Sequence, residues 1–145
     1  VQIDAKMPAR DTRGPIMNPA EKEKFLKLAL RLFGVIFILV YPIGLVWPSG
    51  WIWHGGEGQY YFQMIVGIYF VLGVYLILAA SNPSQHRSLI SFTIWSSVVH
   101  AAFMGVQAFG DESERGHLMG DVPALLLVAV VLWLLSPGME RTARS

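Results

Sequence analysis

Long apolar blocks alternate with short polar connections along the chain. Roughly 20 consecutive apolar residues are needed for a helix to cross about 30 Å of hydrocarbon, and four blocks reach this length. They cover residues 25–47, 60–80, 88–109 and 118–136. None of them shows the period-two alternation of a membrane-spanning strand. Because the bilayer interior offers no water, each block is expected to satisfy its backbone hydrogen bonds as an α-helix.

The connections between the blocks are 7 to 12 residues long. Connections this short make consecutive helices antiparallel neighbours. We therefore predict an all-α integral membrane protein, a four-helix up-down-up-down bundle over residues 25–136. Polar tails flank it, at residues 1–24 and 137–145. Pro42, which is followed two residues later by Gly44, is expected to kink the first helix near its outer end.

Positive charge is distributed unevenly about these helices. Ten of the eleven Lys and Arg residues lie on one side of the predicted membrane, and Arg115 lies on the other. The positive-inside rule then places both termini in the cytoplasm. The ten residues are Lys6, Arg10, Arg13, Lys22, Lys24, Lys27, Arg31, Arg87, Arg141 and Arg144.

Composition agrees with a membrane location and narrows the chemistry. Charged residues make up 14% of the chain, whereas soluble domains contain about 25%. The net charge of +1 gives no reason to expect a nucleic-acid partner. Cysteine is absent, which excludes disulfides, thiolate metal sites, iron–sulfur clusters and a cysteine nucleophile. The first 24 residues are polar and show no secretory signal peptide.

Aromatic and small residues also fit helices in lipid. Tryptophan and tyrosine flank the first outer connection, as interfacial aromatic residues do. Small residues in the second and third blocks are expected to let neighbouring helices pack closely. These residues are Gly67, Gly73, Ser97, Ala101, Ala102 and Gly105.

An ionisable ring, that of His100, lies near the middle of the third block. With 100° of rotation per residue, its stripe of the helix also contains Thr93, Ser96, Met104 and Gln107, and Ser97 is close by. The stripe is expected to face other helices, because a polar ring in contact with lipid is costly. One interpretation is a neutral histidine, hydrogen-bonded to a serine or to another helix. The other is a group that binds a ligand or carries a proton.

His117 and Asp121 form a second candidate pair at the start of the fourth block. Their spacing of four residues allows one helical face to present both side chains at the outer interface. The same residues fit a simple helix start, in which Asp121 caps the helix and Pro123 lies in its first turn. In that interpretation His117 is a solvated loop residue.

Four polar residues can converge on the outer mouth of the bundle, namely Glu57, Gln107, His117 and Asp121. No HExxH, GxSxG, GxGxxG or P-loop pattern accompanies them, so we predict neither an enzyme nor a metal site. A haem held between His100 and His117 is disfavoured, because at 1.5 Å per residue their depths differ by roughly 13 Å. Lipid, a quinone, or a tetrapyrrole with one ligand at His100 are the cofactors that this pattern leaves open.

Two stretches, WSSVVHA at 95–101 and GHLMGDVPALL at 116–126, resemble the BphX-like group of small bacterial four-helix membrane proteins. The similarity extends over about residues 17–137. The group takes its name from a gene neighbourhood concerned with biphenyl degradation. The resemblance implies a bacterial inner-membrane protein of this topology and implies no reaction.

Three functions are compatible with these features. Because the sequence shows no catalytic motif, we predict a non-catalytic accessory or scaffolding subunit of a larger membrane complex, of photosynthetic, respiratory or oxygenase type. Its partners are then lipids and other integral membrane subunits. The first alternative is the binding of a hydrophobic small molecule, quinone or tetrapyrrole around His100. The second is transport of aromatic compounds, for which the gene neighbourhood is the sole argument.

Overall fold

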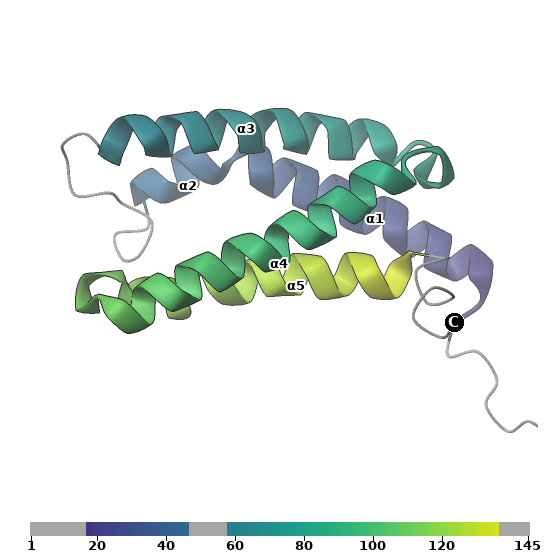
Figure 1. The fold of residues 1–145 in the computed structure, drawn as a ribbon. Helices are drawn as coiled ribbons and strands as arrows, with labels where there is room; N and C mark the ends of the chain where they lie inside the picture. The colour runs from purple at the N-terminus through teal and green to yellow at the C-terminus, as the bar shows by residue number, and fades with distance from the viewer. Residues whose placement is uncertain (1–16, 47–57, 137–145) are drawn as a thin grey trace, which may run out of the picture.

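The computed structural model describes residues 17–46 and 58–136, and all the regular structure in these two ranges is helical (Figure 1). The predicted all-α class is therefore confirmed for this part of the chain. Its α-helices are α1 (Pro19–Ile38), α2 (Val40–Val46), α3 (Gly58–Ala79), α4 (Arg87–Gly110) and α5 (Asp121–Leu135). Two 3₁₀ helices, η1 (Pro83–Gln85) and η2 (Glu112–Leu118), precede α4 and α5.

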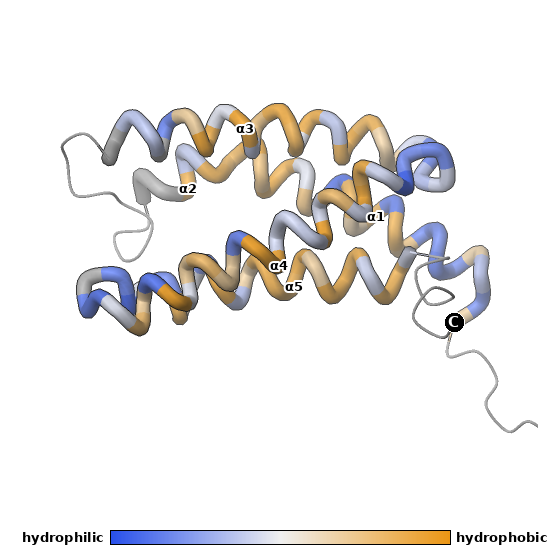
Figure 2. The backbone as a smooth tube through the Cα atoms, in the orientation of Figure 1, coloured by the Kyte–Doolittle hydropathy of each residue, from blue (hydrophilic) through white to orange (hydrophobic). Residues whose placement is uncertain are grey.

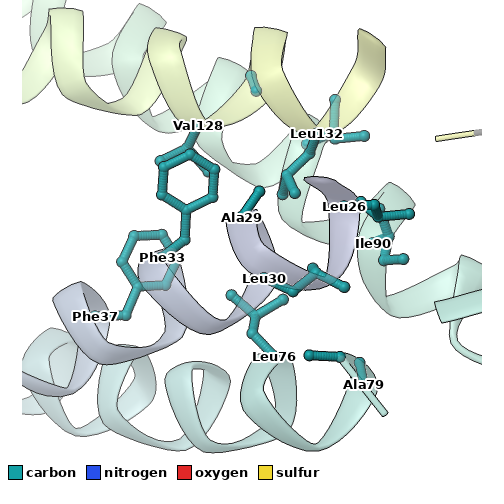
Figure 3. Close-up of a cluster of buried hydrophobic side chains, with 13 residues drawn as sticks. Leu26, Ala29, Leu30, Phe33, Phe37, Leu76, Ala79, Ile90, Val128 and Leu132 are labelled. Atoms are coloured by element: carbon teal, nitrogen blue, oxygen red, sulfur yellow. The ribbon is translucent and has the colours of Figure 1, made fainter. Parts of the chain in front are cut away.

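The helices pack as two pairs. In Figure 1, α1 lies along α3 and α4 lies along α5, while contacts between α1 and α5 join the pairs. Figure 3 shows the core where they meet, with α1 between α3 and α5. The largest fully buried side chains of the described residues are Leu26, Leu30, Leu76, Leu132 and Thr93.

The first helix begins earlier than its apolar block. Asn18 and Glu21 form a capping box, in which the Asn18 backbone N–H donates to Glu21 Oε2 at 3.2 Å. Asn18 Oδ1 accepts in turn from the N–H of Ala20 at 3.3 Å. Because these bonds satisfy backbone groups at the helix end, α1 starts at Pro19. The predicted start at 25 was late, since the first turns of α1 are polar.

The kink expected at Pro42 is present as a break between α1 and α2. Proline has no N–H, so Pro42 cannot donate to the carbonyl of Ile38, four residues earlier. The helix is interrupted at Leu39, whose N–H donates to the carbonyls of Val35 and Ile36 at 3.0 and 3.1 Å. The break therefore lies one turn before the proline that causes it.

The other predicted blocks correspond closely to single helices. α3 and α4 match the ranges 60–80 and 88–109 to within two residues at each end. α5 starts at Asp121, later than the predicted 118, because η2 occupies the chain up to Leu118.

Much of the apolar surface of these helices is uncovered. Two helical segments, Arg87–Gly110 and Glu114–Leu135, are long and apolar enough to span a membrane, and less than a third of each is buried. The shorter segment Gln63–Ala79 is apolar as well. Figure 2 shows hydrophobic residues along most of α3, α4 and α5, with polar ones gathered at the start of α1 and at η1 and η2. On α4, Phe109 is 82% exposed.

Two glycines bring α1 and α3 into backbone contact. A Cβ added to Gly73 would lie 2.5 Å from the carbonyl oxygen of Gly34, and one added to Gly34 would lie 2.7 Å from that of Gly73. No side chain fits there unless the helices separate. The expected close packing at Gly73 is thus confirmed. It was wrong at Gly67 and Gly105, where an added Cβ meets nothing within 4 Å.

Of the other small residues of α4 that were expected to pack closely, some are buried and one is exposed. Ser97 and Ala101 are buried, whereas Ala102 is exposed. Ser97 and Ala101 lie on one face of α4, so the predicted packing is confirmed for that face.

We expect Gly73→Ala to lower the free energy of unfolding by about 1–3 kcal/mol, because the new methyl group forces two backbones apart. Gly67→Ala is the matched control on the same helix, and it should leave stability unchanged or raise it by up to about 1 kcal/mol. Denaturation in detergent, followed by circular dichroism, measures both. Equal effects of the two substitutions would contradict the assigned contact.

A candidate ligand-binding cavity

A cavity of about 190 Å³ lies between the two helix pairs. Every helix from α1 to α5, together with η2, contributes to its wall, which is mostly apolar. Phe33 and Phe37 come from α1, and Leu125 and Val128 come from α5. Four side chains in the wall carry polar groups, and they are Tyr69, His100, His117 and Asp121.

Tyr69 of α3 and His100 of α4 form the first polar pair. The Tyr69 hydroxyl lies 2.9 Å from His100 Nδ1, within hydrogen-bond distance. The two rings are tilted against each other, with centroids 5.8 Å apart. Phe37 of α1 packs edge-on against Tyr69 at a centroid distance of 5.1 Å. The pair therefore links the α1–α3 side of the cavity to α4.

The surroundings of His100 agree with both interpretations of this residue. The ring is hydrogen-bonded to another helix, as the structural interpretation predicted, and its partner is a tyrosine. The same ring lines the cavity, as the ligand-binding interpretation requires. Its Nε2 atom has no hydrogen-bond partner among the described residues, so this atom is available to a ligand.

His117 forms the second polar pair with Asp121. Its Nδ1 contacts Asp121 Oδ2, and its Nε2 lies 2.8 Å from Glu114 Oε2. Only 11% of the His117 side chain and 12% of the Asp121 side chain are exposed, against 42% for Glu114. The imidazole is thus held between two carboxylates, one of which reaches the surface.

Two predictions for this region need correction. Asp121 does not cap α5, because the N-cap is Gly120 and Asp121 is the first helical residue. His117 is not a solvated loop residue. η2 folds this part of the chain against α4 and α5, which turns the His117 ring towards the cavity.

The same fold places His100 and His117 in the wall of one cavity. Their difference in depth was expected to disfavour a haem held between them. A haem between them is still disfavoured, for a different reason: both nitrogen atoms of His117 face carboxylates. Among the described residues, no group of three or more His, Asp or Glu side chains is arranged to hold a metal ion.

The other predicted site residues are scattered. Met104 lines the cavity. Ser96 and Ser97 do not, and Ser96 instead donates to the carbonyl of Thr93 at 3.2 Å. Gln107 is exposed and lies outside the cavity wall, so its predicted place at the mouth was wrong. Glu57 lies outside the described residues.

Sequence reasoning missed Tyr69. A tyrosine inside an apolar block resembles any other aromatic residue that packs against lipid or a helix. One signal was available, because Tyr69 lies four residues before Gly73 and so shares its helical face. A hydroxyl on a face that packs against other helices requires a hydrogen-bond partner.

The chain belongs to a family of unknown function, DUF6632, whose model matches residues 20–144. No curated protein and no solved structure matches it. Nothing in these findings bears on the BphX-like resemblance, which stays a prediction.

We expect Tyr69→Phe to lower the free energy of unfolding by about 0.6–1 kcal/mol, the usual contribution of one hydrogen bond between packed helices. Tyr75→Phe is the control, since Tyr75 lies on the same helix and is 56% exposed. Denaturation in detergent measures both. In a His100→Ala background, Tyr69→Phe should cost nothing further, and an undiminished loss there would show that the hydroxyl stabilises the fold in another way.

Proposed function

We propose that this protein is an integral membrane protein that binds a small amphiphilic molecule in the cavity between its helix pairs. The observation that carries the proposal is the wall itself, which combines a mostly apolar lining with two polar pairs from four different elements. Small-molecule sites are typically built in this way, with a few polar groups that orient a largely apolar ligand.

The cavity volume limits the size of the bound group. Typical sites for drug-sized ligands measure about 300–1,000 Å³, whereas this cavity measures about 190 Å³. A cavity of about 150 Å³ is enough for benzene. The cavity therefore suits a single ring with one polar substituent. A tetrapyrrole macrocycle is far larger, so of the ligands predicted for His100 the small hydrophobic molecules fit best.

The wall also provides a route for an apolar tail. Ile65 of α3 and Leu127 of α5 both line the cavity, although they are 37% and 58% exposed. Their exposure means that the cavity continues onto the outer faces of these helices. In a bilayer those faces meet lipid, so a ligand tail can leave the cavity without entering water.

The membrane arrangement is part of the proposal. α1 with α2, α3, α4 and α5 would provide four crossings of a bacterial inner membrane, with both termini in the cytoplasm. The exposed apolar surface supports this topology, as does the position of the basic residues at one end. The accessory-subunit role and the transport of aromatic compounds stay predictions, because no contact of the described residues favours either of them.

The topology can be tested with single introduced cysteines, because the native chain contains none. Gln85→Cys in η1 and Glu112→Cys in η2 place thiols at opposite ends of α4. A membrane-impermeant maleimide added to intact cells should label the variant at 112 and spare the variant at 85. Permeabilised cells should show labelling of both. Labelling of both variants in intact cells would mean that α4 does not cross the membrane.

Ligand binding can be tested with 4-propylphenol, a single ring with a hydroxyl group and a short tail. We expect the purified protein to bind it, and Ala124→Leu to weaken the affinity about tenfold or more, which corresponds to about 1.4 kcal/mol. Ala124 lines the cavity, so the larger side chain occupies the space of the probe. Calorimetry or ligand-detected NMR in detergent measures the affinity.

Ala102→Leu is the matched control for this experiment. It adds the same atoms at an exposed position of α4 that is not part of the cavity wall, and the affinity should not change. Absence of binding to the native protein would overturn the proposal. Equal binding by both variants would show that the probe lies elsewhere, for example in the detergent.

A further inference from the structure

We infer that the ligand of this cavity is a lipophilic cation, a single-ring molecule that carries an ammonium group. The inference rests on the proposed function and adds the charge of the ligand. It follows from the combination of a carboxylate in the cavity wall, the absence of lysine and arginine from the described part of that wall, and the aromatic rings beside it.

Asp121 provides the negative charge. One of its oxygen atoms, Oδ2, contacts His117, while Oδ1 has no hydrogen-bond partner among the described residues. Because Asp121 is the first residue of α5, the helix dipole favours a negative charge at this position. The side chain is nevertheless only 12% exposed. A carboxylate that is largely removed from water is costly unless a positive charge accompanies it.

His117 supplies only part of that positive charge. It is shared between Asp121 and Glu114, so one imidazole ring faces two carboxylates. Glu114, His117 and Asp121 together keep a net negative charge while both carboxylates are ionised, whether His117 is protonated or neutral. His100, the other histidine of the wall, has its Nδ1 occupied by the Tyr69 hydroxyl.

Among the residues that the structure describes, no lysine or arginine lines the cavity. Arg115 is the nearest in sequence, and it pairs with Glu112 at 3.0 Å, with 60% of its side chain exposed. Between residues 110 and 121 the chain carries four carboxylates and this single arginine. The remaining lysine and arginine residues of the described chain belong to α1 and to the start of α4, and none of them lines the cavity. Lys22, Lys24 and Lys27 lie in the first half of α1, Arg31 lies just past its middle, and Arg87 is the first residue of α4.

The aromatic part of the wall is suited to the same ligand. Phe33, Phe37 and Tyr69 line the cavity, and aromatic faces attract ammonium groups, most strongly where water is excluded. An anionic ligand would meet the carboxylate of Asp121 with no cation to balance it. A neutral ligand would leave that carboxylate without a second partner. The expected order of affinity is therefore cation, then neutral molecule, then anion.

Three probes of similar shape separate these cases. Phenyltrimethylammonium and tert-butylbenzene differ by the exchange of N⁺ for carbon, and benzenesulfonate carries a negative charge. Each competes with 4-propylphenol for the purified protein, and ligand-detected NMR reports the displacement. The ammonium compound should displace the phenol at a concentration at least about tenfold lower than the concentration of tert-butylbenzene that is needed. A difference of this size is expected because the aromatic rings and the carboxylate both attract the positive charge. Benzenesulfonate should displace least.

Asp121→Asn tests the residue that carries the charge. It should reduce the preference for the ammonium compound to less than about threefold while 4-propylphenol still binds, because the cavity keeps its shape. Glu112→Gln is the matched control. It removes one negative charge from the same end of the molecule at a side chain that is 84% exposed and outside the cavity wall, and the preference should persist.

Glu114→Gln provides a second variant if Asp121→Asn melts at a much lower temperature than the native protein. Glu114 is 42% exposed, so its replacement disturbs the interior less and should still reduce the preference. The inference is overturned if tert-butylbenzene or benzenesulfonate displaces the phenol as well as the ammonium compound does. It is also overturned if the preference survives in both variants. Failure of 4-propylphenol itself to bind would instead overturn the proposed function.

Discussion

The backbone contact between Gly34 and Gly73 is the constraint on which the cavity depends. Because neither residue has a side chain, α1 and α3 approach each other until each carbonyl lies within 2.7 Å of the opposite Cβ position. About one turn from this contact on each helix, Phe37 of α1 meets Tyr69 of α3 edge to face. The close approach therefore sets the position of the tyrosine ring, and with it the position of the hydroxyl that His100 contacts. A wider crossing would move Tyr69 away from α4.

The packed core and the cavity adjoin each other and share Phe33, Phe37 and Val128. Leu26, Leu30 and Leu132 are buried where α1, α3 and α5 meet, and they fill the space without polar atoms. The polar pairs lie nearer η2, and each joins residues of two different elements. A cavity destabilises a protein in proportion to its volume. The hydrogen bond and the ion pairs around this one help to offset that cost, and they hold the wall in shape while it is empty.

The sequence predicted features that depend on local patterns. Apolar blocks located α3 and α4, and the missing N–H of Pro42 accounted for the break near Leu39. Features that depend on two distant segments were missed. Gly34 could not be paired with Gly73 without the crossing geometry, and Tyr69 had no visible partner. The helix α5 starts later than predicted because η2 has no apolar periodicity, and the interpretation of Asp121 as a cap fails because Gly120 is the N-cap.

The error at Gln107 shows where a helical wheel stops being informative. The stripe that contains His100 does face other helices, and Thr93 on it is fully buried. A wheel gives the direction of a side chain and says nothing of how far along the helix a neighbour extends. Two turns beyond His100, α4 approaches η2, and Gln107 is exposed there although it shares the stripe. Whether a residue lines the cavity therefore depends on its position along the helix axis as well as on its helical face. Met104 lines the cavity, and Gln107, which lies further along the helix, does not. The same argument explains His117, which reaches the cavity because η2 brings it back along α4 and α5.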